Sequence, residues 1–333
     1  TQNGNLEVGT LSSNASLSNS GTITATNAFT ATEYINSTSD IVKIKEVTTL
    51  SIENGTISTL NVEKTDDKND FATISTTGTL IISSATYNNA DIQTSGNITL
   101  ANTIDSDTIG NLTIESGTLT IENLNVGNLT NKANFSSSTV NITGNLTDDS
   151  GTSFAGTINF VGNGEQTFTP NTSTTYGDIS INEKAKLQTN NGIEINATSF
   201  DVKEGAELIL NNATVTTSED SIYRGLSGTG FTISAAESKK ITIDQEIVET
   251  EGNQNYFASV KLSRETTFKS GGTIIFGNTT TNAFVQNDDV APKLILQAPT
   301  VIYGNSTIDS LTTSDSLSLE SDNTINNLSV TNA

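Results

Sequence analysis

The chain has no cysteine, histidine, methionine or tryptophan, and it has only three prolines. Without cysteine, neither disulfides nor thiolate metal sites can hold the fold together. A cysteine-free chain also suits export through a bacterial periplasm, where stray thiols would be crosslinked. Its only arginines are Arg224 and Arg264, which argues against broad recognition of phosphate or sulfate by guanidinium groups.

Long hydrophobic runs are missing as well. No stretch approaches the roughly 20 apolar residues of a membrane-spanning helix, so we expect no direct membrane insertion by these residues. The chain begins at Thr1 without an initiator methionine or a signal peptide, which indicates a processed product or part of a longer protein. Any membrane tether would then lie outside this sequence.

Positive charge is scarce, with 15 basic against 37 acidic residues and a formal net charge of −22. Nucleic acids and anionic membrane surfaces repel such a chain, and the charge keeps it soluble. We therefore expect no nucleic-acid partner. The sequence also shows no cofactor-binding motif, and we expect no cofactor.

The apolar and aromatic fractions are low, at 33% and 5%, which is close to the composition of a disordered chain. The pattern argues against disorder, because short runs alternate apolar and polar residues between Gly, Asn, Asp or Ser. The clearest runs are Asn97–Leu100, Asn111–Ile114, Thr118–Ile121 and Leu124–Val126. Strands with one buried face have this period, and they can fill a core that is one side chain deep.

The pattern predicts an all-β fold, a parallel β-helix (β-solenoid) with loop excursions. Coils of roughly 17 to 24 residues would each contribute two or three short strands. Right-handed coiling is favoured, because crossovers between parallel strands prefer that hand. The alternative is a string of antiparallel β-sandwich modules of about 110 residues, which the shortness of the runs disfavours.

The expected organisation is one continuous solenoid over residues 1–333. Residues 1–130 are N-terminal coils, 131–215 and 258–333 are two copies of a longer block, and 216–257 are an irregular insertion or join with room for a short helix. Gly156–Phe160 followed by Phe168 returns as Gly272–Phe276 followed by Phe284. Copying a block of several coils produces such a repeat.

Paired carboxylates are the strongest candidates for chemistry, at Asp66–Asp67, Asp148–Asp149 and Asp288–Asp289. A pair of this kind can act as acid and base on a polysaccharide, or can hold calcium. Each pair lies among turn residues, where Asp bonds its own backbone, and this favours a structural role. We therefore assign no catalytic, cofactor-binding or metal-binding residues.

Three further patterns allow a functional and a structural interpretation. Asn-x-Ser/Thr sequons can be glycosylation sites, or their asparagine side chains can stack on one another from coil to coil. They occur at Asn97, Asn111, Asn128, Asn141, Asn145, Asn196 and Asn305. Thr-x-Thr steps, as in Thr22–Thr26, do not recur at one fixed coil position in the sequence, which favours ordinary solvated strands. We expect several tyrosines at the surface, where they would either anchor a glycan or protein partner or cover apolar patches. These are Tyr87, Tyr176, Tyr223 and Tyr303.

The Asn/Thr/Ser/Gly-rich coils, such as Gly110–Gly117 and Gly156–Gly164, carry a resemblance that covers nearly the whole chain. The chain resembles the β-helical passenger and stalk regions of Gram-negative autotransporters and related large secreted adhesins. The resemblance implies an extracellular location on the bacterial surface, with outer-membrane association through parts outside this chain. The Asn-Pro-Asn-Leu motif of two-partner secretion and the Gly-Asp-Ser-Gly motif of passenger proteases are missing.

The sequence thus predicts a non-enzymatic surface protein that acts in adhesion or as a component of a surface layer or filament. Expected partners are a host or bacterial surface protein or glycan, and further copies of the chain along the solenoid. The alternative is a carbohydrate-active β-helix that binds or cleaves polysaccharide through a carboxylate pair. Because binding sites often lie where a repeat is broken, the candidate loops are residues 64–70 and 216–257, with Asp66, Asp67, Asp70, Tyr223 and Arg224.

Overall fold

The computed structural model describes the chain apart from residues 1, 4, 21, 37–40, 47, 66–69, 104–106, 155, 278–284, 288–292, 304–305 and 332–333. The protein is all-β, and its parallel strands stack as a β-solenoid of about 14 turns. No helix is present in the described residues, so none there has the length and hydropathy needed to cross a membrane. The predicted fold class is confirmed, and the parallel pairing rules out the antiparallel modules.

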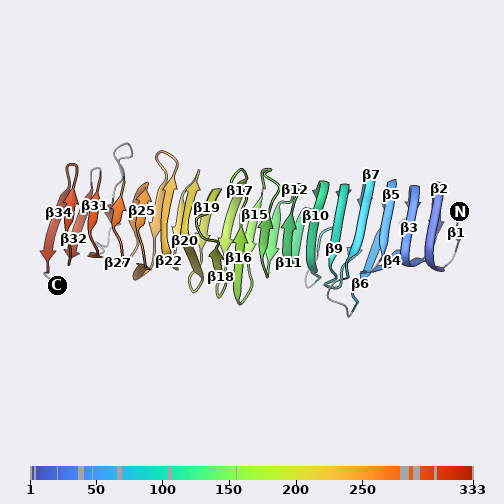
Figure 1. Cartoon of the computed structure of the whole chain (residues 1–333), viewed down its shortest axis with the longest axis horizontal. Helices are drawn as coiled ribbons and strands as arrows, with labels where there is room; N and C mark the ends of the chain where they lie inside the picture. Colours follow the sequence, from blue (N-terminus) through green and yellow to red (C-terminus); the bar gives the residue numbers. More distant parts are fainter. Residues whose placement is uncertain are drawn as a thin grey trace. The chain divides into compact units, whose positions relative to one another are not determined.

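The chain divides into two compact units, Thr1–Thr157 and Ile158–Ala333. Figure 1 shows the successive coils of each unit side by side. The strands of the first unit are β1 (Gln2–Asn3), β2 (Leu6–Ser20), β3 (Thr22–Asn36), β4 (Ile41–Lys45), β5 (Thr49–Ile57), β6 (Thr59–Glu63), β7 (Ala72–Ile82), β8 (Ala85–Thr86), β9 (Ile92–Thr99), β10 (Ile109–Thr120), β11 (Asn123–Asn131), β12 (Asn134–Ser136), β13 (Thr139–Ile142) and β14 (Leu146–Asp148).

The second unit contains almost all of β15, whose first residue is Thr157, and the strands that follow it. These are β15 (Thr157–Phe160), β16 (Glu165–Thr169), β17 (Thr175–Ile181), β18 (Lys186–Thr189), β19 (Glu194–Val202), β20 (Glu207–Thr217), β21 (Ser221–Tyr223), β22 (Leu226–Ala235), β23 (Lys240–Ile243), β24 (Ile247–Thr250), β25 (Gln254–Phe257), β26 (Ser259–Leu262), β27 (Thr266–Ser270), β28 (Ile274–Phe276), β29 (Val285–Asn287), β30 (Lys293–Gln297), β31 (Thr300–Ile302), β32 (Thr307–Thr313), β33 (Leu317–Leu319) and β34 (Thr324–Val330).

The length of a coil varies along the chain. Thr118 pairs with Asn134, 16 residues later, whereas Thr266 pairs with Leu294, 28 residues later. The strands of this longer coil nevertheless pair in parallel with those of the coil before it, Thr266 to Lys269 with Leu294 to Gln297. Residues 216–257, where an insertion or join with a short helix was expected, contain β21 to β25 and form no helix.

Alternation places every second side chain inside. In β13 and β15 the pattern is half-buried, buried, half-buried, buried, and the buried positions are Ile, Val or Phe. Aromatic rings pack along the core of the second unit, where Tyr256 stacks on Phe276 with centroids 5.1 Å apart and meets Phe268 edge-on at 5.6 Å. Such ring pairs stabilise a core beyond the area they bury.

One corner of the first unit is built from a repeated Gly-Asn pair, at Gly110–Asn111, Gly127–Asn128 and Gly144–Asn145. The glycines allow close approach, because a Cβ on Gly127 would lie 2.2 Å from the Gly110 carbonyl oxygen. The asparagines form a ladder, in which Asn128 Nδ2 donates to Asn111 Oδ1 at 2.7 Å, and the Asn145 N–H donates to Asn128 Oδ1 at 2.7 Å. The stacking interpretation of these sequons is therefore confirmed.

Candidate functional site

The base of the predicted loop at residues 64–70 is anchored by a buried carboxylate, Glu46. Its Oε2 accepts hydrogen bonds from the Thr65 backbone N–H at 2.5 Å and the Thr65 hydroxyl at 2.9 Å, and its Oε1 accepts one from the Asp91 N–H at 2.7 Å. Glu46 is only 1% exposed, and these bonds compensate for its burial. Glu46 therefore ties Thr65, the last described residue before position 66, to the coil of Asp91.

The three aspartates proposed in this loop have different outcomes. Asp66 and Asp67 lie outside the described residues. Asp70 is half-buried, and its Oδ2 lies 2.9 Å from the Thr65 hydroxyl. Asp70 thus belongs to the base of the loop.

The two other predicted residues are neighbours that face opposite sides of the solenoid wall. Tyr223 is fully buried, with its ring stacked on Phe200 at 6.3 Å, and burial raises the pKa of its phenol. Tyr87 and Tyr176 are buried too, whereas the sequence suggested that all three were exposed. Arg224 follows Tyr223 and reaches the outer surface.

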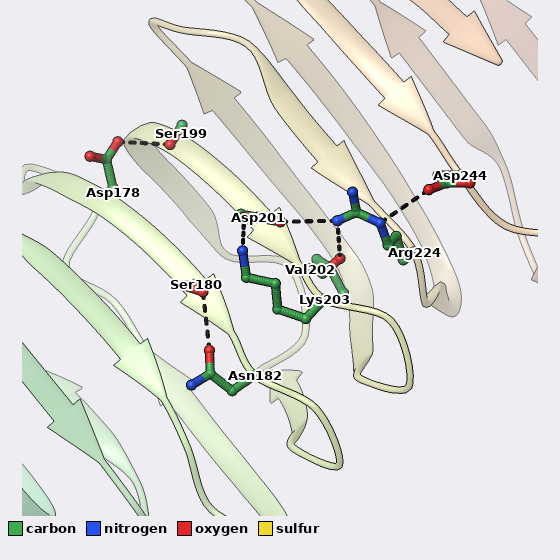
Figure 2. Close-up of polar contacts among 9 residues, drawn as sticks. All are labelled: Asp178, Ser180, Asn182, Ser199, Asp201, Val202, Lys203, Arg224 and Asp244. Atoms are coloured by element: carbon green, nitrogen blue, oxygen red, sulfur yellow. Dashed lines mark hydrogen bonds and ion pairs between the residues drawn. The ribbon is translucent and has the colours of Figure 1, made fainter. Parts of the chain in front are cut away.

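Arg224 is the centre of a charged ladder that crosses successive coils (Figure 2). Its Nε donates to Asp244 Oδ2 at 3.1 Å, and its Nη1 donates to Asp201 Oδ1 at 3.2 Å and to the Val202 carbonyl at 3.3 Å. Lys203 forms a second ion pair with Asp201. All these partners come from the neighbouring coils, so Arg224 links three turns of the second unit.

The same ladder includes the second arginine. Arg264 Nε lies 2.8 Å from Asp244 Oδ1, and this carboxylate raises the pKa of the Arg264 guanidinium. Asp244 thus lies between Arg224 and Arg264, and its side chain is only 19% exposed. Both guanidinium groups of the chain are consequently engaged in pairing coils, and the ladder acts as structure.

An open groove lies beside this ladder, with a volume of about 550 Å³. Its charged lining consists of Asp244, Glu246, Arg264 and Glu265, and the side chain of Ile247 is 55% exposed at its edge. The groove offers carboxylates to a ligand. Within the described residues, no cluster of three or more Asp or Glu side chains has an arrangement that could hold a metal ion.

The predicted carboxylate pairs do not form such a site where they are described. Asp148 is 1% exposed and accepts hydrogen bonds from Asn131 Nδ2 at 3.0 Å and from the Ser150 hydroxyl at 2.7 Å, whereas Asp149 is exposed. The two carboxylates therefore face different environments, because consecutive residues of an extended segment point to opposite sides. The pairs Asp66–Asp67 and Asp288–Asp289 lie outside the described residues.

The first unit carries an uncharged sheet face that the sequence analysis missed. Here β5, β7, β9, β10 and β12 pair in parallel and present two outward columns. We call these ten residues the neutral face: Asn54, Thr79, Asn97, Thr118 and Asn134 in one column, and Thr56, Ile81, Thr99, Thr120 and Ser136 in the other. Asn and Thr alternate along the first column, and hydroxyls occupy four of five positions in the second.

The signal for this face is present in the sequence as five Asn/Thr-x-Thr/Ile/Ser steps. It becomes visible only when the coil register is known, because the steps are separated by unequal numbers of residues. Only one of the five steps, Thr118–Thr120, is a Thr-x-Thr step, so a strict threonine ladder is not what this face forms.

Comparison with known proteins adds no relative: no protein-family model, no curated protein and no solved structure matches the chain.

Proposed function

We propose that this protein is a non-enzymatic, extracellular β-solenoid that acts at a bacterial surface, in adhesion or as part of a surface layer or filament. The observation that carries this proposal is the neutral face, a regular five-strand surface on which most of the exposed polar side chains make no hydrogen bond within the described residues. The charged and amide ladders elsewhere are used to pair coils, whereas this face is available to a partner. A protein surface or a glycan is the expected partner.

Composition supports the location. A chain with net charge −22 and no cysteine suits an oxidising, extracellular environment and disfavours nucleic acids as partners. The membrane association that we propose depends on parts outside this sequence. The resemblance to autotransporter passengers points in the same direction.

Self-association along the solenoid has its own support. In β34 the side chains of Leu328 and Val330 are 53% and 63% exposed, whereas Leu311 and Thr313, which pair with them one coil earlier, are buried. Parallel strands with exposed core positions can accept a further strand, either from a continuation of the same chain or from a second copy.

Two measurements test the proposal. Surfaces coated with the purified chain should retain bacterial or epithelial cells above the level of an albumin coating, and sedimentation of the chain should reveal concentration-dependent assembly. Absence of cell retention, together with a strict monomer up to millimolar concentration, would contradict both forms of the proposal.

A carbohydrate-active β-helix is a second candidate, favoured by the groove that contains Glu246 and Glu265. Two carboxylates on neighbouring coils beside an open groove are the minimum for acid and base catalysis on a glycan. Release of reducing sugar from neutral or acidic polysaccharides, lost in the double variant E246Q/E265Q, would establish this candidate. Turnover that survives both changes would exclude the groove.

A further inference from the structure

Five exposed polar side chains of the neutral face have no partner within the described residues, whereas Asn54 Oδ1 at the end of the first column accepts a hydrogen bond from the Thr79 N–H at 3.1 Å. The side chains of Asn97, Thr99, Thr120, Asn134 and Ser136 are exposed, and none of them makes a hydrogen bond or ion pair within the described residues. Asn97 and Asn134 lie in the same column with Thr118 between them, so their amides are two strands apart and do not bond each other. This differs from Asn111 and Asn128, whose amides form the corner ladder.

The face is also flat along one border. Gly78, Gly96, Gly117 and Ala133 directly precede Thr79, Asn97, Thr118 and Asn134 of the first column. Gly96 and Gly117 pair in adjacent coils, and a Cβ on Gly117 would lie 2.3 Å from the Gly96 carbonyl oxygen. These four border residues carry no side chain beyond a methyl group, and only at Asn54 does a larger side chain, the exposed Glu53, precede the column.

The chemistry of the face excludes most classes of partner. None of its ten residues is charged in a chain with 37 acidic side chains, and Ile81, 42% exposed, is its only apolar residue. An acidic partner would be repelled by the net charge, a basic partner finds no carboxylate here, and an apolar partner finds one isoleucine. A neutral partner rich in hydroxyl groups matches the amides and hydroxyls, which both donate and accept.

The shape of the face selects a polymer over a small molecule. Five strands at a spacing of about 4.8 Å give a surface about 19 Å long, with its two columns about 7 Å apart. Single hydrogen bonds at an open surface contribute only about 1 kcal/mol each, so a small sugar would bind too weakly to be retained. An extended chain that repeats its hydroxyl groups engages many of these side chains at once.

From these observations we infer that the neutral face binds an extended, uncharged polysaccharide. The inference rests on the proposed surface function and names the partner of that surface. It needs no charged contact and no metal ion.

Depletion from solution by insoluble polysaccharide tests the inference. The probes are cellulose and chitin powders, with chitosan at pH 6 as a cationic comparison. The parent chain should be depleted by cellulose, chitin or both, equally at 50 mM and 500 mM NaCl, because uncharged contacts are not screened by salt. Binding to chitosan alone, lost in high salt, would overturn the inference.

A matched pair of variants locates the binding. T99K/T120K places two lysines on paired positions of the neutral face. T113K/T130K places two lysines on paired, half-buried positions of another outward face, on the coil of Thr120 and the coil that follows it. The first variant should bind polysaccharide roughly tenfold more weakly than the parent, and the second should bind like the parent. Equal binding by all three proteins would overturn the assignment to this face, as would equal loss in both variants while their circular dichroism stays unchanged.

The cell-retention assay separates this inference from the proposed function. If cells are retained but no polysaccharide is bound, the proposed function stands and the neutral polysaccharide is the wrong partner. If polysaccharide is bound through Thr99 and Thr120 but no cells are retained, the binding face stands and the role in adhesion fails.

Discussion

Replacement of Gly127 by alanine should show how closely the coils of the first unit are packed. Gly127 lies in the corner column between Gly110 and Gly144. A Cβ at this position would lie 2.2 Å from the Gly110 carbonyl oxygen, whereas real Cβ atoms essentially never approach closer than 3.0 Å. One of the two coils must therefore move by at least the difference, about 0.8 Å.

The cost of this movement follows from the bonds at the corner. The movement separates the coil of Gly110 from the coil of Gly127, which are joined here by the hydrogen bond from Asn128 Nδ2 to Asn111 Oδ1 at 2.7 Å, and a shift of that size along the bond brings it to the limit of hydrogen bonding. Loss of one hydrogen bond costs about 1 kcal/mol, and overpacking adds about 1 to 3 kcal/mol. We expect G127A to lower the free energy of unfolding by about 2 to 4 kcal/mol.

Urea unfolding followed by circular dichroism measures this loss, and hydrogen exchange should place it in the coils around Gly127. The control is G164A, since a Cβ on Gly164 meets nothing within 4 Å, and its effect should stay within about 0.5 kcal/mol. If G127A and G164A unfold at the same urea concentration, the close approach of the corners is not a constraint and the reasoning is refuted.

Three other predictions concern the described contacts. Burial raises the pKa of Tyr87, Tyr223 and Tyr256, so above about pH 10 the unfolded chain loses these protons while the native chain keeps them, and stability falls as pH rises. Each tyrosine lowers the free energy of unfolding by about 1.4 kcal/mol per pH unit in this range. The melting temperature of Y223F should therefore fall less than that of the parent between about pH 10 and 12. In the charged ladder, a double-mutant cycle of D244A with R264A should give a coupling of about 0.5 to 1 kcal/mol, and zero coupling would mean that this pair does not link the coils. N128A should cost about 1 kcal/mol because it removes two rungs of the asparagine ladder, whereas N134A removes no hydrogen bond and should be neutral by the same urea assay.

The alternation of apolar and polar residues was sufficient to predict the fold class, because an apolar residue at every second position over many short runs indicates β-strands with one buried face. Leu112, Leu129 and Leu146 follow identical Gly-Asn pairs and lie in one buried column, as their spacing indicates. The tyrosines were misjudged, since a hydroxyl suggests the surface while the ring favours the core. Tyr87 resolves this conflict by donating its hydroxyl to the Ala101 carbonyl at 2.7 Å.

The candidate sites were harder to predict because they depend on register. Arg224, Asp244 and Arg264 follow one another at intervals of 20 residues, whereas the next coil, from Thr266 to Leu294, is 28 residues long. Unequal coil lengths hide which outward residues share a column. The neutral face is the clearest case, because its ten residues are ordinary in sequence and form a surface only after the coils are aligned.

The parallel ladders also determine how the molecule would respond to force. The hydrogen bonds between coils run along the stacking direction. Tension applied along this direction in either unit would therefore break the hydrogen bonds between one pair of coils at a time. Each coil that opens would release a segment of about 20 residues, which extends by about 65 to 70 Å. A tether built in this way would lengthen stepwise under flow while the coils that remain stacked keep their outer faces intact.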